Sequence, residues 1–239
     1  MGTIAARLDA VRKRIDQACR DAGRDPADVR LLPVSKTQGV DRIEEAYAAG
    51  VRIFGENKAQ EVAEKAALLA GRPDLSWAVI GHLQTNKAKV VAQYATEFHA
   101  LDSARVAEAL DRRLNNAGRA LDVFLQVNSS GEESKHGLDP ADVEQFAKSM
   151  RQYRSLRVRG LMTLAVLSDD QDAVRRCFER MQQLQIRLQN ADQAAGSYAE
   201  LSMGMSGDFE LAIAHGATTV RVGQAIFGSR SEPDEYWST

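Results

Sequence analysis

The chain alternates between runs of residues typical of β-strands and segments with helical periodicity. Amphipathic patterns separate the strand-like runs, and in one of them Val174, Cys177, Phe178 and Met181 share a helix face. Eight strands alternating with helices indicate a parallel sheet, either a closed barrel or an open doubly wound sheet. The strand-like runs lie at residues 31–35, 51–54, 77–80, 97–101, 121–127, 156–164, 199–203 and 218–222.

We favour a single α/β domain over residues 1–239, a (β/α)8 TIM-type barrel with an additional N-terminal helix. Turns containing glycine follow the seventh and eighth strand-like runs, where such barrels often bind phosphate. The 239 residues are a normal length for one barrel, and no linker or repeat divides the chain. The helical spacing of Ile4, Leu8 and Val11 predicts the extra helix, which should end near Gly23.

Composition excludes several classes of protein. The net charge of −2 argues against a general binder of nucleic acid or anionic membranes. The N-terminus has no continuous apolar segment, so we expect neither a signal peptide nor a membrane span, and a cytoplasmic location. Cys19 and Cys177 fall in helical patterns and should be packed thiols. We expect no metal site, because the histidines (82, 99, 136 and 215) lack metal-ligand spacing.

Lys36 ends the first strand-like run, where a buried lysine would be unusual. Desolvation lowers the pKa of a lysine, and a neutral amine can attack an aldehyde to form a Schiff base. The alternative is a lysine that merely faces solvent at the barrel mouth.

Arg221 interrupts the last strand-like run. The period of two places Val220 and Val222 on one face, toward the helices, and Arg221 on the other, toward the barrel interior. A buried guanidinium needs an acceptor, either a carboxylate of an internal ion pair or a ligand. Opposite a pyridine nitrogen it would donate a hydrogen bond and leave that nitrogen unprotonated, which makes the ring a poor electron sink.

Two turns could supply amide groups to a phosphate. Ser206 is placed to cap a helix that begins before Phe209, and a helix N-terminus attracts anions. Gly223 and Gln224 provide a second turn. A lysine, an arginine and such a phosphate site together suggest pyridoxal phosphate.

Two further residues could line the same site. Asn57 follows the second strand-like run and could reach the ring hydroxyl or the lysine, although asparagine there is most often a helix N-cap. His82 follows the third run and is expected to be a surface histidine or one with its hydrogen bonds satisfied.

In their order along the chain, six motifs resemble those of the pyridoxal phosphate homeostasis proteins (the YggS/PROSC family). The resemblance covers nearly the whole chain and implies a barrel similar to the N-terminal domain of alanine racemases. The motifs are Pro33-Val34-Ser35-Lys36-Thr37, Phe54-Gly55-Glu56-Asn57, Ile80-Gly81-His82-Leu83-Gln84-Thr85-Asn86-Lys87, Arg159-Gly160-Leu161-Met162, Leu201-Ser202-Met203-Gly204-Met205-Ser206 and Val220-Arg221-Val222-Gly223-Gln224-Ala225-Ile226-Phe227-Gly228.

The resemblance also implies a role for each predicted cofactor-binding residue. Pyridoxal 5'-phosphate would bind Lys36, Arg221 would meet the pyridine nitrogen, and Asn57 would line the ring. Ser206 and the turn at Gly223-Gln224 would hold the phosphate. Gln224 stands where the family usually has threonine; a lost hydroxyl contact would cost roughly 1.5–3 kcal/mol at most.

The resemblance favours a monomeric, non-catalytic carrier that acts in vitamin B6 and amino-acid homeostasis, with apo-enzymes as possible recipients. One alternative is a pyridoxal-phosphate-dependent racemase. That reaction needs a second acid or base, which alanine racemases take from a C-terminal domain that we expect this chain to lack. Its tyrosines, at 47, 94, 153, 198 and 236, fall in helix, loop or tail contexts. A lysine-dependent aldolase is a third hypothesis, but it does not explain Arg221.

Overall fold

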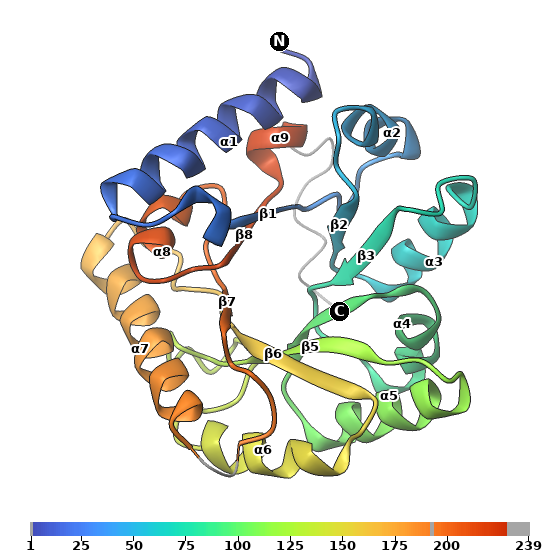
Figure 1. The fold of residues 1–239 in the computed structure, drawn as a ribbon, viewed down its shortest axis with the longest axis vertical. Coiled ribbons are helices and arrows are strands. Elements are labelled where there is room, and N and C mark those ends of the chain that lie inside the picture. Colours follow the sequence, from blue (N-terminus) through green and yellow to red (C-terminus); the bar gives the residue numbers. More distant parts are fainter. Residues whose placement is uncertain (1, 192–193, 229–239) are drawn as a thin grey trace.

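The predicted barrel is confirmed: eight parallel strands close into a ring surrounded by helices (Figure 1). This computed structural model describes residues 2–191 and 194–228. The strand order is β1-β8-β7-β6-β5-β4-β3-β2, and a parallel bridge between Val34 and Gly55 joins the two ends. The strands are Arg30–Pro33 (β1), Ile53–Glu56 (β2), Ser76–Val79 (β3), Glu97–Leu101 (β4), Leu121–Gln126 (β5), Leu156–Met162 (β6), Glu200–Ser202 (β7) and Thr219–Val222 (β8).

Helices follow the strands and cover the outside of the barrel (Figure 1). They are α2 (Val40–Ala48), α3 (Ala59–Leu68), α4 (Ala88–Tyr94), α5 (Ala104–Asn116), α6 (Val143–Ser149), α7 (Gln171–Gln189), α8 (Phe209–Ala214) and α9 (Gln224–Phe227), with short 3-10 turns η1 (Pro26–Asp28), η2 (Thr85–Lys87) and η3 (Met150–Gln152). Within residues 2–191 and 194–228, no helix combines the length and the apolar character that a membrane span requires.

The additional N-terminal helix is also confirmed, as α1 (Ile4–Asp21). The hydroxyl of Thr3 caps it by accepting a hydrogen bond from the amide of Ala6. Its buried face packs against α2, α8 and α9, so it covers the seam where the last and first strands meet (Figure 1). Arg14 of α1 pairs with Glu210 of α8 at 2.5 Å.

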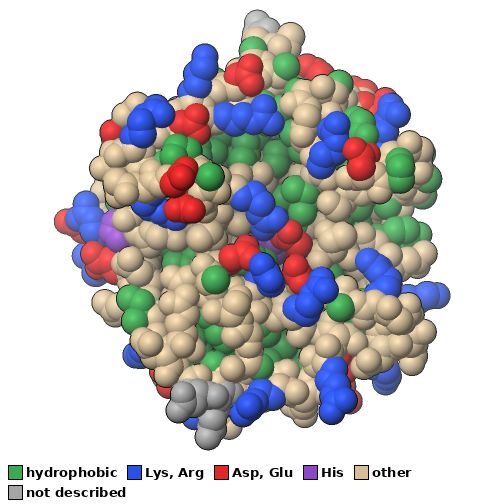
Figure 2. Space-filling model, viewed as in Figure 1, with side chains coloured by type: hydrophobic (Ala, Val, Ile, Leu, Met, Phe, Trp, Pro, Cys, Tyr) green, Lys and Arg blue, Asp and Glu red, His purple; other side chains and the backbone are tan. Residues whose placement is uncertain are grey.

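Ion pairs connect the N-terminal ends of the strands. Charged side chains of both signs gather near the centre of the face that Figure 2 shows. Most of these pairs are partly exposed, and exposed pairs contribute only about 0–1 kcal/mol each. The apolar layer between strands and helices therefore supplies most of the stability. The pairs are Arg30–Glu97 (2.5 Å), Arg157–Asp122 (2.6 Å) and Arg159–Glu200 (3.0 Å).

Candidate functional site

The six predicted cofactor residues lie together on one side of the barrel mouth. Parallel strands end at the same edge of the sheet, and β7, β8, β1 and β2 are consecutive neighbours in the barrel. The fold thus gathers residues that are up to 188 positions apart in the sequence. Lys36 follows β1, Asn57 follows β2, Ser206 follows β7, Arg221 lies in β8, and Gly223 and Gln224 follow β8.

The backbone on both sides of Lys36 is held in place. The buried Ser35 donates its amide to the carbonyl of Gly55 at 3.0 Å, which ties this segment to β2. On the other side, Thr37 has a φ of 63°, and its amide donates to Oε2 of Glu61 at 3.0 Å. A left-handed conformation is uncommon for a β-branched residue and requires support from its surroundings. The half-buried Lys36 side chain therefore starts from a fixed position.

A buried ion pair lies directly beneath this segment. Nζ of Lys65, on α3, donates to Oε1 of Glu56 at 2.7 Å, to Oε2 of Glu61 at 3.0 Å and to the carbonyl of Ser35 at 2.9 Å. Ser35 Oγ donates to the same Glu56 oxygen at 2.6 Å. Burial raises the pKa of Glu56 to about 7, against the lowering effects of Lys65 and Ser35.

The sequence pattern alone does not indicate this network. Glu61 and Lys65 have the i, i+4 spacing of a helical ion pair, which is usually a surface feature. Lys65 is buried because α3 packs against β2 and β3 and places its ammonium on Glu56 and the carbonyl of Ser35.

Arg221 points into the barrel, as its strand alternation predicts. It is 3% exposed, and its guanidinium donates to Oγ of Ser202 at 2.8 Å and to the carbonyl of Thr163 at 2.7 Å. Within residues 2–191 and 194–228, no carboxylate lies within ion-pairing distance of Arg221, so the described residues do not supply the internal ion pair with a glutamate. Burial lowers the pKa of Arg221 to about 10, against the opposing charge of Asp208.

Arg221 instead reaches a carboxylate through two intermediate side chains. Nδ1 of His99 lies 2.9 Å from Oγ of Ser202, and Nε2 lies 2.8 Å from Oε2 of Glu97. Because Ser202 accepts from Arg221, its hydroxyl can donate to His99, which then donates from Nε2 to Glu97. Glu97 and His99 are two positions apart on β4 and so share its interior face, a spacing that is visible in the sequence.

The hydrogen-bonded series from Arg221 to Glu97 sets the charge states of these side chains inside the barrel. Burial lowers the pKa of His99 below its usual value, against the effect of Glu97. Burial would raise the pKa of Glu97, but hydrogen bonds from His99 and Arg30 lower it to about 2. His99 is therefore neutral between a charged carboxylate and a charged guanidinium near pH 7.

The two turns predicted to bind phosphate leave their amide groups available. Within the described part of the chain, the amides of Ser206, Gly207, Gly223 and Gln224 donate no hydrogen bond. Gly223 packs tightly against Val34, the residue after β1, since a Cβ at position 223 would lie 3.0 Å from the carbonyl oxygen of Val34. This contact holds the second turn beside the segment that carries Lys36.

The predicted capping role of Ser206 is wrong. The first residue of α8 is Phe209 and its N-cap is Asp208, while Ser206 lies in the preceding turn. Asp208 accepts a hydrogen bond from the amide of Met205 at 2.5 Å and so closes that turn before the helix begins. Because Ser206 does not cap α8, its hydroxyl can contact other partners.

Asn57 is not a helix cap either. The N-cap of α3 is Lys58, and the half-buried Asn57 lies in the bend after β2. Gln224 is the first residue of α9, with an exposed side chain, so its backbone amide rather than its side chain belongs to the turn. His82 lies at the surface, as expected, with 41% of its side chain exposed.

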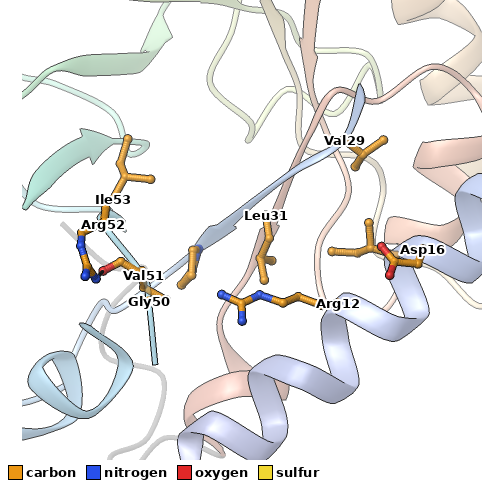
Figure 3. A pocket seen from close by; sticks show the side chains of 10 residues that line it. Arg12, Asp16, Val29, Leu31, Gly50, Val51, Arg52 and Ile53 are labelled. Atoms are coloured by element: carbon orange, nitrogen blue, oxygen red, sulfur yellow. Dashed lines mark hydrogen bonds between the residues drawn. The ribbon is translucent and has the colours of Figure 1, made fainter. Parts of the chain in front are cut away.

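A separate cavity of about 280 Å³ lies between α1 and the first two strands (Figure 3). Arg12 and Asp16 of α1 line it together with Leu31 of β1 and Arg52, which precedes β2. None of the six predicted cofactor residues lines it.

The sequence matches the alanine racemase N-terminal domain over residues 6–231. It is 42% identical over 230 residues to the pyridoxal phosphate homeostasis protein of Pseudomonas aeruginosa, covering 96% of this chain and 97% of that protein. The Escherichia coli K12 protein with the same name is 38% identical over 232 residues, covering 96% and 98% of the two chains.

Solved structures of similar proteins show the same fold. PipY of Synechococcus elongatus with PLP bound superposes with a TM-score of 0.83 at 38% identity, over 94% of this chain and all of PipY (100%). Alanine racemase of Streptomyces coelicolor has a TM-score of 0.72 at 17% identity, over 94% of this chain but 58% of the racemase, and so shares the fold. By its sequence and its barrel, this chain belongs to the pyridoxal phosphate homeostasis protein family, whose members are built on the alanine racemase N-terminal domain.

Proposed function

We propose that this chain binds pyridoxal 5'-phosphate on Lys36 as a Schiff base and acts in intracellular vitamin B6 and amino-acid homeostasis without dedicated catalysis. The observation that supports this most is the gathering of three features at one side of the barrel mouth. They are a lysine on a fixed segment, a buried arginine that pairs with no carboxylate of the described residues, and two turns with available amides. The relative PipY with PLP bound supports the same cofactor.

The residues at the mouth suit the chemical groups of this cofactor. Nζ of Lys36 would attack the aldehyde carbon, and the carbonyl oxygen would leave as water. The amides of Ser206, Gly207, Gly223 and Gln224 would donate to the phosphate. The amide of Asn57 would meet the ring hydroxyl. Because these backbone amides do not depend on the residue type, glutamine in place of threonine at 224 should retain them.

Arg221 would donate a hydrogen bond to the ring nitrogen. Even with its pKa lowered to about 10, the guanidinium stays charged near pH 7 and has no lone pair to accept a proton. The ring nitrogen therefore stays unprotonated, and the cofactor would trap amines reversibly while stabilising carbanions poorly. This favours a carrier that limits the free aldehyde and passes it to apo-enzymes.

The proposal is tested by the absorbance of the purified protein after incubation with pyridoxal 5'-phosphate and dialysis. A retained band at the violet edge of the visible range, lost on borohydride reduction with a matching gain in mass, is the expected result. A protein that retains no such band would refute cofactor binding.

We expect Arg221→Glu to weaken cofactor retention at least tenfold, because a carboxylate can bind the ring nitrogen only when one of the two groups is protonated. Retention is measured by the rate of transfer of cofactor to an apo-enzyme. Arg221→Gln keeps a neutral donor, so its cofactor retention should lie between that of Arg221→Glu and that of the parent chain. Unchanged retention in both folded variants would restrict Arg221 to a structural role.

We also expect no appreciable racemase turnover. The four described tyrosines (47, 94, 153 and 198) all precede strands and so lie at the end of the barrel opposite Lys36, while Tyr236 lies outside the described residues. A missing general acid or base costs about 10²–10⁴-fold in rate. The assay incubates cofactor-loaded protein with L-alanine in deuterated water. Rapid deuterium incorporation at Cα together with D-alanine would favour the racemase instead.

A further inference from the structure

A second group of chemically active side chains lies at the same mouth, on the side of β3, β4 and β5. His82 follows β3, Asp102 follows β4, and His136 lies in the segment between β5 and α6. One ligand atom from each side chain lies within 4.8 Å of the other two. From this convergence we propose that His82, Asp102 and His136 form a binding site for a divalent transition-metal ion such as Zn²⁺.

The three residues come from backbone that tertiary contacts hold in place. His82 follows Gly81, where a Cβ would lie 2.3 Å from the carbonyl oxygen of Asn57. The carbonyl of His136 accepts a hydrogen bond from the side chain of Gln126 at 3.0 Å. The bridge between Val127 and Leu138 fixes the chain just beyond His136 against the end of β5. The two histidines are therefore brought together by the barrel and not by chance contact of free loops.

The donor set suits an ion of this class. Imidazole nitrogens favour Zn²⁺, Ni²⁺ and Cu²⁺ over Mg²⁺ and Ca²⁺, and two histidines with one carboxylate are a recurrent set of protein ligands. The carboxylate of Asp102 is only 11% exposed and lies 3.5 Å from Nδ1 of His82. The ammonium of neighbouring Lys135 is engaged by Glu132 at 2.5 Å and by the carbonyl of Ala165 at 3.0 Å.

The two imidazoles can adjust to a metal at low cost. Their rings are stacked, with centroids 3.9 Å apart and planes 9° from parallel. Metal–nitrogen bonds of about 2.0–2.1 Å require the nitrogen lone pairs to converge, so the rings must turn out of the stack. Both histidines are exposed, which leaves room for this rotation and leaves coordination positions open to water or to an anionic ligand.

The site is tested by calorimetric titration of Zn²⁺ into the tag-free purified chain. We expect one ion per chain, and a loss of affinity of about 100-fold or more in His82→Ala, Asp102→Asn and His136→Ala, since even the supporting partners of metal ligands are worth 10–100-fold. His215→Ala, at a histidine on the end of α8, is the matched control and should bind as the parent chain does. The titration uses cofactor-free protein, which separates this site from chelation by the cofactor.

A second measurement checks that the variants remain folded. Zn²⁺ should raise the melting temperature of the parent chain and of His215→Ala but not of the three ligand variants, whose melting temperatures without metal should stay close to that of the parent. Absence of saturable binding would overturn the site. Zn²⁺ affinity that is unchanged in the three ligand variants would also overturn the site. A loss of affinity in His215→Ala equal to that in the ligand variants would do the same.

Discussion

Replacing Lys36 with alanine is expected to abolish the imine absorbance band of the cofactor-loaded protein. Alanine has no amine, so no covalent bond to the aldehyde can form at this position. The turns after β7 and β8 would remain and could still hold the phosphate. The variant should therefore bind the cofactor only reversibly, with the spectrum of the free aldehyde and with no mass gain after borohydride treatment.

Lys58→Ala is the matched control for this experiment. Lys58 is an exposed lysine that follows β2 at the same barrel mouth. Its replacement should leave the band intact. If Lys36→Ala retains the band while Lys58→Ala loses it, the anchor has been assigned to the wrong lysine.

Replacing Lys65 with methionine should lower the free energy of unfolding by about 3–5 kcal/mol. This change keeps an unbranched side chain, one atom shorter, but leaves the fully buried Glu56 without its ammonium partner. Removing one partner of a buried pair is costly because the remaining charge is left uncompensated. The carbonyl of Ser35 also loses a donor. Urea unfolding followed by circular dichroism measures the loss.

The pH dependence of this loss identifies its cause. Burial already raises the pKa of Glu56 from 4.5 to about 7, so its contribution to stability is fully present below pH 4.5 and is lost as the pH rises through about 7. Without Lys65 that pKa should rise further, because the attractive charge is gone. The deficit of Lys65→Met should thus be smaller at pH 5 than at pH 8.

The double variant Lys65→Met with Glu56→Gln provides the control. A neutral amide is cheaper to bury than an unpaired carboxylate, so the double variant should recover part of the stability and lose the pH dependence. A single variant as stable as the parent, or a deficit that is the same at both pH values, would contradict the buried-pair explanation.

The sequence by itself determined the architecture and the direction of the key strand residues. Strands covered by helices are apolar along their length, and helices carry a repeating apolar face, so eight alternating patterns indicated a parallel sheet. The glycine-containing turns after the seventh and eighth runs favoured a closed barrel over an open sheet. The same reasoning placed Arg221 inside, because a strand's side chains alternate and the valines at 220 and 222 suit the helix layer. Lys36 could be placed at the mouth because its position after β1 follows from the strand pattern alone.

Only the tertiary structure decided which polar groups are partners. Periodicity encodes burial, but it does not record which distant side chain meets a buried one. Lys65 has the spacing of a surface helix residue, yet the packing of α3 buries it against Glu56. Ser206 precedes a helix, but the carboxylate of Asp208 closes the turn and moves the cap. His82 and His136 show no ligand spacing in the sequence and stack only because the barrel brings the ends of β3 and β5 to one edge.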